Sequence, residues 1–311
     1  MKTLMLVLVP MEFNLFTKKY FLLVISVAIF CWALAFPSIR FLLDEGLSPI
    51  NLTIMRIFIT CISFVIIISL KKNYISIPQK RDIPYIIILG LINAVVYHLA
   101  LNYGEQFVSP SVASLIIIMV PIFVIILSMV FLKERMTQEI ILGVFLAIFG
   151  TVIITFIGTQ NLILKVTYFA GVFAIFLAAI SAAFYSILGK RLLEKYNTLS
   201  ILSFSFLFGS FGLMPFFDNS IFSELLNLSI IGWITLLSLG IFSTVLAYFL
   251  WFTALEIKRV SEVAVYIYFI PFLSTIISYF LLHEKITLWF VVGGAFIILG
   301  VTIVDRHRNK S

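Results

Sequence analysis

The sequence predicts an all-α integral membrane protein with ten transmembrane helices, arranged as two inverted repeats of five. Three observations lead to this fold class: the composition, the number of long apolar segments, and a repeat within the chain. Hydrophobic residues make up 62% of the 311 residues and charged residues only 11%, and the mean hydropathy is +1.19. Soluble domains carry about 25% charged residues, so this chain cannot cover itself with a surface that faces water.

The repeat has a constant offset of 150 residues. A segment that begins at Pro121 and contains Glu134 recurs with Pro271 and Glu284 at the equivalent positions. A gap-free offset in a chain about twice as long indicates an internal duplication. The other identities in the first copy are Ile126, Ser128, Leu132, Thr137, Gly143, Ile148, Gly150 and Ile153. They match Ile276, Ser278, Leu282, Thr287, Gly293, Ile298, Gly300 and Ile303.

The first half of the chain predicts five membrane-spanning helices. A helix needs about 20 apolar residues to cross about 30 Å of hydrocarbon, and each apolar segment has about that length. The second segment begins with Pro49 directly after Ser48, a pair typical of a helix N-terminus. The predicted spans are 20–39, 49–70, 83–103, 111–132 and 138–157.

The second half repeats this count after a linker at 158–167. Its predicted spans are 168–189, 199–217, 230–254, 260–282 and 286–304. The two repeats therefore cover 19–157 and 168–305. Because each repeat has an odd number of spans, the halves must cross the membrane in opposite orientations. Inverted repeats are typical of secondary transporters, in which a site near the midplane opens alternately to each side.

The Lys and Arg residues predict the orientation, because they concentrate in cytoplasmic loops. With the N-terminus in the cytoplasm, seventeen of them lie in cytoplasmic segments, and only Arg40, Lys165 and Lys285 lie outside. We therefore expect a multi-pass plasma-membrane protein with both termini in the cytoplasm. This topology explains the net charge of +7, so nucleic acid is not an expected partner. The expected partners are the lipid bilayer and a small-molecule substrate.

The N-terminal residues 1–16 contain a short apolar run with no small-residue cleavage site after it. We interpret them as an early start codon or a mobile tail, in preference to a cleaved leader. Cys31 and Cys61 lie in apolar runs and are expected to be small core residues. The sequence shows no metal-ligand spacing and no cofactor motif, so neither a metal nor a cofactor is expected.

With these features the chain resembles the drug/metabolite transporter superfamily, and within it the EamA-like exporters. The resemblance rests on the twice-repeated Pro…Leu-x-Glu-[Arg/Lys]-x-Thr…Gly…Gly pattern, on the ten spans, and on three further sequence features. These are Arg56, the run Tyr-His-Leu-Ala-Leu-Asn-Tyr-Gly at 97–104, and Trp251 followed by Ala254-Leu255. The resemblance covers residues 19–305. It implies that spans 1, 3, 4, 6, 8 and 9 line a central cavity and that spans 5 and 10 are peripheral.

Polar and aromatic residues recur on corresponding faces of the third and eighth spans. His98 in the third span has Tyr248 as its equivalent in the eighth. Because hydrocarbon offers no hydrogen-bond partners, such groups normally face the interior of a helix bundle. For any single aromatic residue, anchoring at the membrane interface is the alternative. The predicted substrate-binding residues are Trp32, Tyr97, His98, Tyr185, Tyr248, Trp251 and Tyr266.

Two ionisable residues within spans have competing interpretations. Arg56 lies about 10 Å into the second span. It either binds a substrate carboxylate or pairs with loop carbonyls or with Glu105. His98 has the side-chain type that titrates near neutral pH, which suits a coupling proton. Its equivalent is Tyr248, however, and this favours a hydrogen-bonded interior histidine.

The repeated prolines and glutamates are predicted to be structural or gating residues. Pro121 and Pro271 lack the N–H that a helix interior uses, so both helices should bend there. The bends either shape or gate the cavity, or they are merely structural kinks. Glu134 and Glu284 end the fourth and ninth spans on opposite faces, which favours a structural role in the following turns over a one-sided role in binding.

The predicted function is that of a secondary transporter, an exporter of small organic metabolites such as amino acids, and not an enzyme. The driving force is either a proton gradient or an exchanged counter-substrate, since no segment resembles an ATP-binding loop. One alternative is a nucleotide-sugar or phosphorylated-metabolite carrier of the same fold, which should present two or more Lys or Arg residues to the phosphates. An intramembrane enzyme is the weaker alternative, because no nucleophile has a basic partner.

Overall fold

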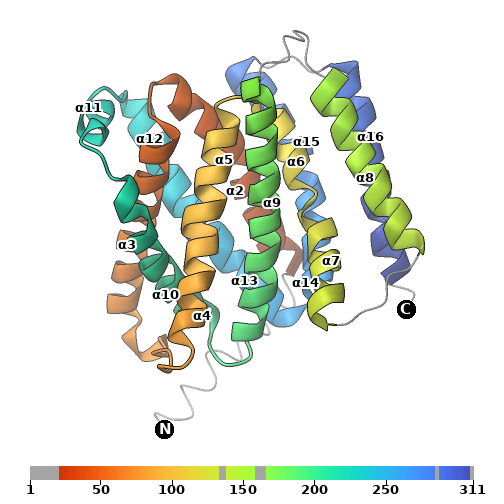
Figure 1. Ribbon diagram of the computed structural model, residues 1–311. Coiled ribbons are helices and arrows are strands. Elements are labelled where there is room, and N and C mark those ends of the chain that lie inside the picture. Colours follow the sequence, from red (N-terminus) through yellow and green to blue (C-terminus); the bar gives the residue numbers. More distant parts are fainter. Residues whose placement is uncertain (1–20, 133–137, 158–165, 284–286, 309–311) are drawn as a thin grey trace.

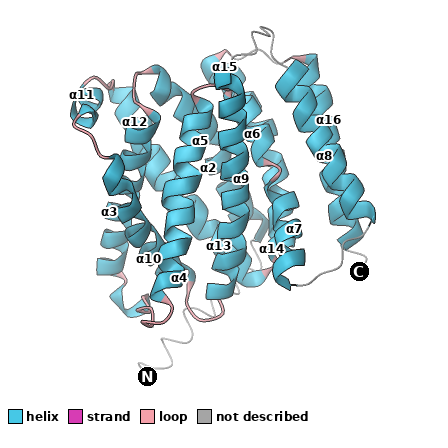
Figure 2. Ribbon diagram, viewed as in Figure 1, coloured by secondary structure: helices cyan, strands magenta, loops and turns pink. Residues whose placement is uncertain are grey.

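The computed structural model describes residues 21–132, 138–157, 166–283 and 287–308. Helices and their connecting loops make up this part of the chain (Figure 2). Seven helical runs are long and apolar enough to cross a membrane. Three shorter apolar helices, at 141–150, 266–282 and 288–300, occupy the positions predicted for spans 5, 9 and 10. The all-helical membrane fold predicted from the sequence is thus confirmed.

In the first repeat, spans 3 and 4 are each built from more than one helical segment. Span 1 is α2 (Phe21–Asp44) and span 2 is α3 (Pro49–Leu70). Span 3 joins α4 (Ile83–Gly90), a π-helix η2 (Leu91–Tyr97) and α5 (His98–Glu105). Span 4 joins α6 (Pro110–Ile117) and α7 (Val120–Leu132), and span 5 is α8 (Gln138–Ile157).

The second repeat is built in the same way. Span 6 is α9 (Val166–Leu192), and span 7 is α10 (Thr198–Ser210) continued by the 3₁₀ helix η3 (Phe211–Phe216). The short α11 (Ser220–Leu226) precedes span 8, which joins α12 (Ile230–Ser238), a π-helix η4 (Leu239–Leu246) and α13 (Ala247–Ile257). Span 9 joins α14 (Val260–Ala264), the 3₁₀ helix η5 (Val265–Tyr268) and α15 (Phe269–Leu282). Span 10 is α16 (Leu288–Arg308).

Span 1 is five residues longer at its end than the sequence predicted. The sequence placed its end at Ile39, whereas the helix continues to Asp44. Arg40 and Asp44 lie four residues apart and form an ion pair at 3.0 Å. Such i,i+4 pairs stabilise a helix, so the charged residues extend the span and do not end it.

Both spans with a predicted proline bend are interrupted just before the proline. α6 ends at Ile117, four residues before Pro121, and the chain leaves α-helical geometry until α7 begins at Val120. In span 9 the 3₁₀ helix η5 contains Ile267, four residues before Pro271. A proline ring clashes with the carbonyl four residues earlier and cannot donate to it. The same chemistry therefore interrupts both spans at equivalent positions.

The π-helices in spans 3 and 8 are a feature that the sequence did not predict. Residues 91–97 map onto 241–247 at the repeat offset, so η2 and η4 occupy overlapping positions in the two repeats. Gly90 directly precedes η2 and Gly240 lies within η4, and each glycine lies where two helices approach closely. A Cβ on Gly90 would lie 2.0 Å from the Ser205 carbonyl oxygen, and one on Gly240 would lie 2.5 Å from Cγ2 of Ile59. Short π-helical turns of this kind are frequent at functional sites.

The fifth and tenth spans form a pair at the edge of the molecule. Figure 1 shows α8 and α16 side by side, beside the bundle formed by the other spans. Their backbones approach closely, since a Cβ on Gly150 would lie 2.4 Å from the Gly293 carbonyl oxygen. Small residues allow such approaches between membrane helices. The pair is peripheral, as the resemblance implied.

Candidate functional site

A small cavity lies in the middle of the bundle, between the two repeats. Its volume is about 40 Å³. Spans 1, 3, 4, 6, 8 and 9 all contribute lining residues, as the resemblance implied, and span 2 contributes Arg56. Among the described residues that line it, Arg56 is the one charged side chain. The five aromatic Trp and Tyr residues of the wall are Trp32, Tyr97, Tyr185, Tyr248 and Trp251.

The aromatic residues pack against one another across the repeat boundary. The ring centroid of Trp32 lies 5.1 Å from that of Trp251 and 5.4 Å from that of Tyr248. Tyr185 lies 5.6 Å from Tyr248 in an edge-on arrangement. These separations fall in the range that aromatic pairs prefer. Four predicted residues from spans 1, 6 and 8 thus form one continuous aromatic wall.

Arg56 is buried, with 2% of its surface exposed. Its Nε donates to the hydroxyl of Thr244 at 2.9 Å, and Nη1 has no hydrogen-bond partner among the described residues. Among the described residues, no loop carbonyl, one of the predicted partners, is bonded to it. Glu105, another, is also buried and interacts electrostatically with the guanidinium. Nη1 belongs to an arginine that lines the cavity, and binding of a substrate carboxylate to it stays a prediction.

His98 lies beside the cavity and not on its wall. It is fully buried, its Nδ1 lies 2.7 Å from the Asn93 carbonyl oxygen, and its ring packs edge-on against Tyr97. Asn93 also accepts a hydrogen bond from the Tyr248 hydroxyl at 2.9 Å. His98 and Tyr248, equivalent by sequence, therefore meet at the same asparagine.

The other predicted residues are divided among several places. Tyr266 is half-buried and packs against Phe21 with the ring centroids 5.6 Å apart, while its neighbour Ile267 lines the cavity. Pro121 and Pro271 are buried at the interruptions of spans 4 and 9. The predictions for Glu134 and Glu284 fall outside the residues that the structure describes.

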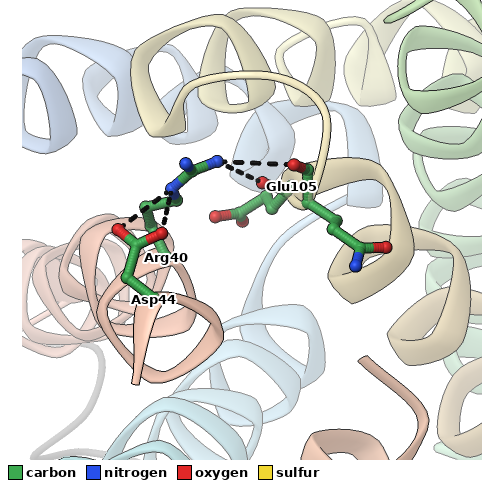
Figure 3. Close-up of polar contacts among 4 residues, drawn as sticks. Arg40, Asp44 and Glu105 are labelled. Carbon is green, nitrogen blue, oxygen red and sulfur yellow. Dashed lines mark hydrogen bonds and ion pairs between the residues drawn. The ribbon is translucent and has the colours of Figure 1, made fainter. Parts of the chain in front are cut away.

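Two equivalent basic residues connect helix ends on opposite faces of the protein. Figure 3 shows Arg40 between Asp44 and the end of α5, where its Nη1 donates to the carbonyls of Glu105 at 3.2 Å and Gln106 at 3.5 Å. At the offset of 150, Arg40 corresponds to Lys190 and Glu105 to Leu255. The ammonium of Lys190 donates to the carbonyl of Leu255 and, at 3.2 Å, to that of Lys258. We call these contacts the Arg40 latch and the Lys190 latch.

Both sets of contacts are formed in this structure, and the cavity between them is small. Sites that enclose a drug-sized ligand measure about 300–1,000 Å³, many times the 40 Å³ found here. The wall therefore has to move apart before a metabolite can enter.

Thr244 and Asn93 were not among the predicted substrate-binding residues, although both lie on the polar and aromatic faces of spans 8 and 3. Thr244 is separated from its partner Arg56 by 188 residues. At the offset of 150, Thr244 corresponds to Ala94 and Arg56 to Phe206, whereas Asn93 corresponds to the polar Ser243. The offset therefore relates neither Thr244 nor Arg56 to a polar residue, and it could not predict the bond between them. The sequence signal that was available is a polar residue within an apolar span.

Comparisons with known proteins agree with this architecture. The model of the EamA-like transporter family matches twice, at residues 19–156 and 169–305. An uncharacterized transporter of Archaeoglobus fulgidus is 36% identical over 94% of this chain and its own full length. The transporter YdfC of Bacillus subtilis is 32% identical over 92% of this chain and 90% of its own.

More distant similarities extend over the same length. A protein of Streptantibioticus cattleyicolor named "Probable terminal-alkyne amino-acid exporter" is 28% identical over 94% of each chain. A protein of known crystal structure superimposes with a TM-score of 0.66 over 93% of this chain and 98% of its own, at 18% identity, which supports the fold. From the two family matches and the relatives that share its full length, the chain belongs to the EamA-like transporter family.

Proposed function

We propose that this EamA-family transporter is a secondary exporter of small amphipathic carboxylates, amino acids among them, and that it works by alternating access. The observation that carries the proposal is the composition of the cavity wall. A single buried guanidinium with a free N–H faces a continuous aromatic surface. A guanidinium binds a carboxylate through charge-assisted hydrogen bonds, and aromatic rings suit the apolar part of the same molecule.

The two latches support alternating access. Each joins span 1 or 6 to the end of span 3 or 8 of its own repeat, and the two lie on opposite faces. A contracted cavity with both latches closed is the form expected between two open states. Opening the Arg40 latch would admit solvent from one side, and opening the Lys190 latch would admit it from the other.

Export of an amino acid is supported by the name of the relative from Streptantibioticus cattleyicolor. A carrier for phosphorylated metabolites is less well supported, because phosphate groups call for more than one cation. Among the described residues of the wall, Arg56 alone supplies one.

The orientation is also part of the proposal. The charge distribution favours a cytoplasmic Lys190 latch and an outer Arg40 latch. Both Asn73 and Asn219 are exposed, on the connections that should lie inside and outside respectively. In intact cells, a cysteine at Asn219 should react with an impermeant thiol reagent and one at Asn73 should not. The reverse pattern would contradict the orientation, and labelling of both would contradict the span count.

The test of function is an uptake panel of amino acids and other small acids. It should be run in inside-out and right-side-out vesicles, with and without a proton gradient. We expect at least one apolar amino acid to accumulate in inside-out vesicles. Arg56→Gln should abolish most of that uptake, while Arg81→Gln, a matched change at an exposed arginine, should not.

Two results would overturn parts of the proposal. Uptake of phosphorylated compounds alone would favour the alternative carrier. Uptake that is unaffected by Arg56→Gln in folded protein would remove the carboxylate site. Dependence on the proton gradient, or on a solute loaded inside the vesicle, would identify the coupling.

A further inference from the structure

Thr244 holds the guanidinium of Arg56 from the opposite repeat. Arg56 belongs to span 2 of the first repeat, and Thr244 belongs to the π-helix η4 in span 8 of the second. The 2.9 Å bond from Nε of Arg56 to Oγ1 of Thr244 is therefore a contact between repeats. Both side chains are at least 98% buried, so water does not compete for the bond.

The π-helix fixes the direction of the Thr244 hydroxyl. A hydroxyl has one proton to donate and two lone pairs to accept with. The hydroxyl of Thr244 donates its proton to the carbonyl of Leu239, five residues earlier, at 2.9 Å. Leu239 and Thr244 are five residues apart, which is the spacing of one π-helical turn. With its proton used, the hydroxyl presents lone pairs to Arg56.

This arrangement determines which edge of the guanidinium is left for a ligand. Arginine has five N–H donors in a rigid planar fork. With Nε bonded to Thr244, the remaining edge of the fork is the one that carries Nη1, which is buried without a hydrogen-bond partner. A buried charged donor without a partner costs free energy, and a carboxylate in the cavity would remove that cost.

The fold does not require this pair. At the repeat offset, Thr244 corresponds to Ala94 and Arg56 to Phe206. Span 3 nevertheless forms its π-helix around Ala94. The polar pair is therefore a specialisation of one side of the cavity and not a part of the repeated architecture.

We propose that Thr244 is the positioning residue of the carboxylate site: it aims the guanidinium of Arg56 at the substrate and thereby assembles the site from both repeats. The inference rests on the proposed function, since it assigns a role within that site. It predicts that the preference for a carboxylate depends on the Thr244 hydroxyl, whereas binding of the apolar part of the substrate does not.

The experiment compares the binding of amino acids with that of their amides. The probes are the twenty amino acids and the corresponding amides, and binding to purified protein is followed by tryptophan fluorescence and by the rise in Tm. Wild-type protein should bind at least one amino acid more tightly than its amide. Thr244→Val, which keeps the shape and loses the hydroxyl, should weaken binding of that amino acid about tenfold. Binding of the amide should stay unchanged, and Thr244→Ser should restore the preference.

Two further variants test whether the effect is specific to the loss of the Thr244 hydroxyl. Thr244→Ala places in span 8 the residue that span 3 tolerates at the equivalent position, and it should behave as Thr244→Val does. Thr253→Val is the matched control, because Thr253 is a buried threonine of span 8 whose hydroxyl donates to its own helix at Phe249. It should leave the preference intact.

The possible failures are distinguishable. If wild-type protein prefers no amino acid over its amide, the carboxylate site itself is wrong, and the role of Thr244 is wrong with it. If the preference exists and survives in folded Thr244→Val and Thr244→Ala, the proposed function stands and Thr244 is not a positioning residue. Equal weakening of the amino acid and its amide would also overturn the inference, because it would indicate a general packing defect.

Discussion

Spans 3 and 8 share a backbone and differ in how their buried polar atoms are bonded. Both contain a π-helix at equivalent positions. In span 8 the hydroxyls of Ser243, Thr244 and Tyr248 each donate a hydrogen bond. In span 3, by contrast, side-chain atoms of Asn93, His98 and Asn102 are buried without a partner.

The comparison shows that the two repeats kept the same backbone in these spans, whereas their side chains diverged. A buried polar atom without a partner costs about 1–3 kcal/mol, so three in one span are a considerable cost in the contracted conformation. Water or a substrate can offset that cost when the cavity opens. In the proposed mechanism, span 8 would supply a fixed aromatic wall, and the polar atoms of span 3 would gain partners when the cavity opens.

The largest expected effect on stability concerns Gly90 and Gly240, the equivalent glycines at the two π-helices. Gly90→Ala would place a Cβ 2.0 Å from a main-chain oxygen, and Gly240→Ala would place one 2.5 Å from Cγ2 and 2.8 Å from Cβ of the branched Ile59 side chain, so both changes require a helix to shift. We expect Gly90→Ala to destabilise the protein by about 3 kcal/mol or more and Gly240→Ala by about 2 kcal/mol. Folded yield and Tm in detergent measure both. Equal tolerance of the two changes would show that the helix contacts are looser than described.

The aromatic wall gives the next effect. Trp251 is 2% exposed, and truncation to Ala removes apolar contact worth about 1–3 kcal/mol. Substrate affinity should fall about tenfold, and Trp251→Phe should retain most of it. Phe173 of span 6, which is 69% exposed, is the control, and Phe173→Ala should leave affinity unchanged. Wild-type affinity in folded Trp251→Ala protein would mean that other faces bind the substrate.

Opposite effects are expected from breaking the two latches. In protein with Cys31 and Cys61 replaced by Ala, a cysteine at Ser186 reports access to the cavity wall. Arg40→Ala should raise its labelling from outside the cell, and Lys190→Ala should lower it. Loss of about 1 kcal/mol of latch free energy changes each population about fivefold. Changes in the same direction would exclude the latches as opposed gates.

The smallest effect concerns an ion pair on the Lys190 face. The Tyr196 hydroxyl, at 2.7 Å, and the Lys195 ammonium, at 3.0 Å, hold the pKa of the Asp82 carboxyl below its ordinary value of 3.8. A lowered pKa stabilises the fold above the unfolded value and ceases to do so as the pH falls through the folded one. Asp82→Asn should therefore lower Tm slightly at neutral pH.

That difference in Tm should vanish as the medium is acidified below about pH 4. Ser69→Ala is the control, because it removes a hydrogen bond from the Ser69 hydroxyl to the Val65 carbonyl, two groups that do not titrate. It should show no comparable pH dependence. A pH dependence of the same form in both variants would exclude the ion pair as its cause.

Hydropathy and the repeat offset predicted most of the fold. Long apolar segments mark the helices that are buried in lipid, and the offset shows that the two halves repeat the same helices. Tyr97 and Trp251, which line the cavity, were singled out because they lie on the corresponding polar and aromatic faces of spans 3 and 8. The π-helices were not predictable, since a π-turn uses the same apolar residues as an α-turn. The bond between Arg56 and Thr244 was not predictable either, because it depends on how two distant spans are rotated.

The small size of the cavity also bears on whether protons and ions can leak through the protein. A water molecule needs about 10–15 Å³ of such space, so 40 Å³ holds about three. That number is far too small to bridge about 30 Å of hydrocarbon. Protons and ions crossing by way of this cavity would find no continuous file of water. An idle copy should therefore not leak, and a cell can carry many copies without discharging its membrane potential.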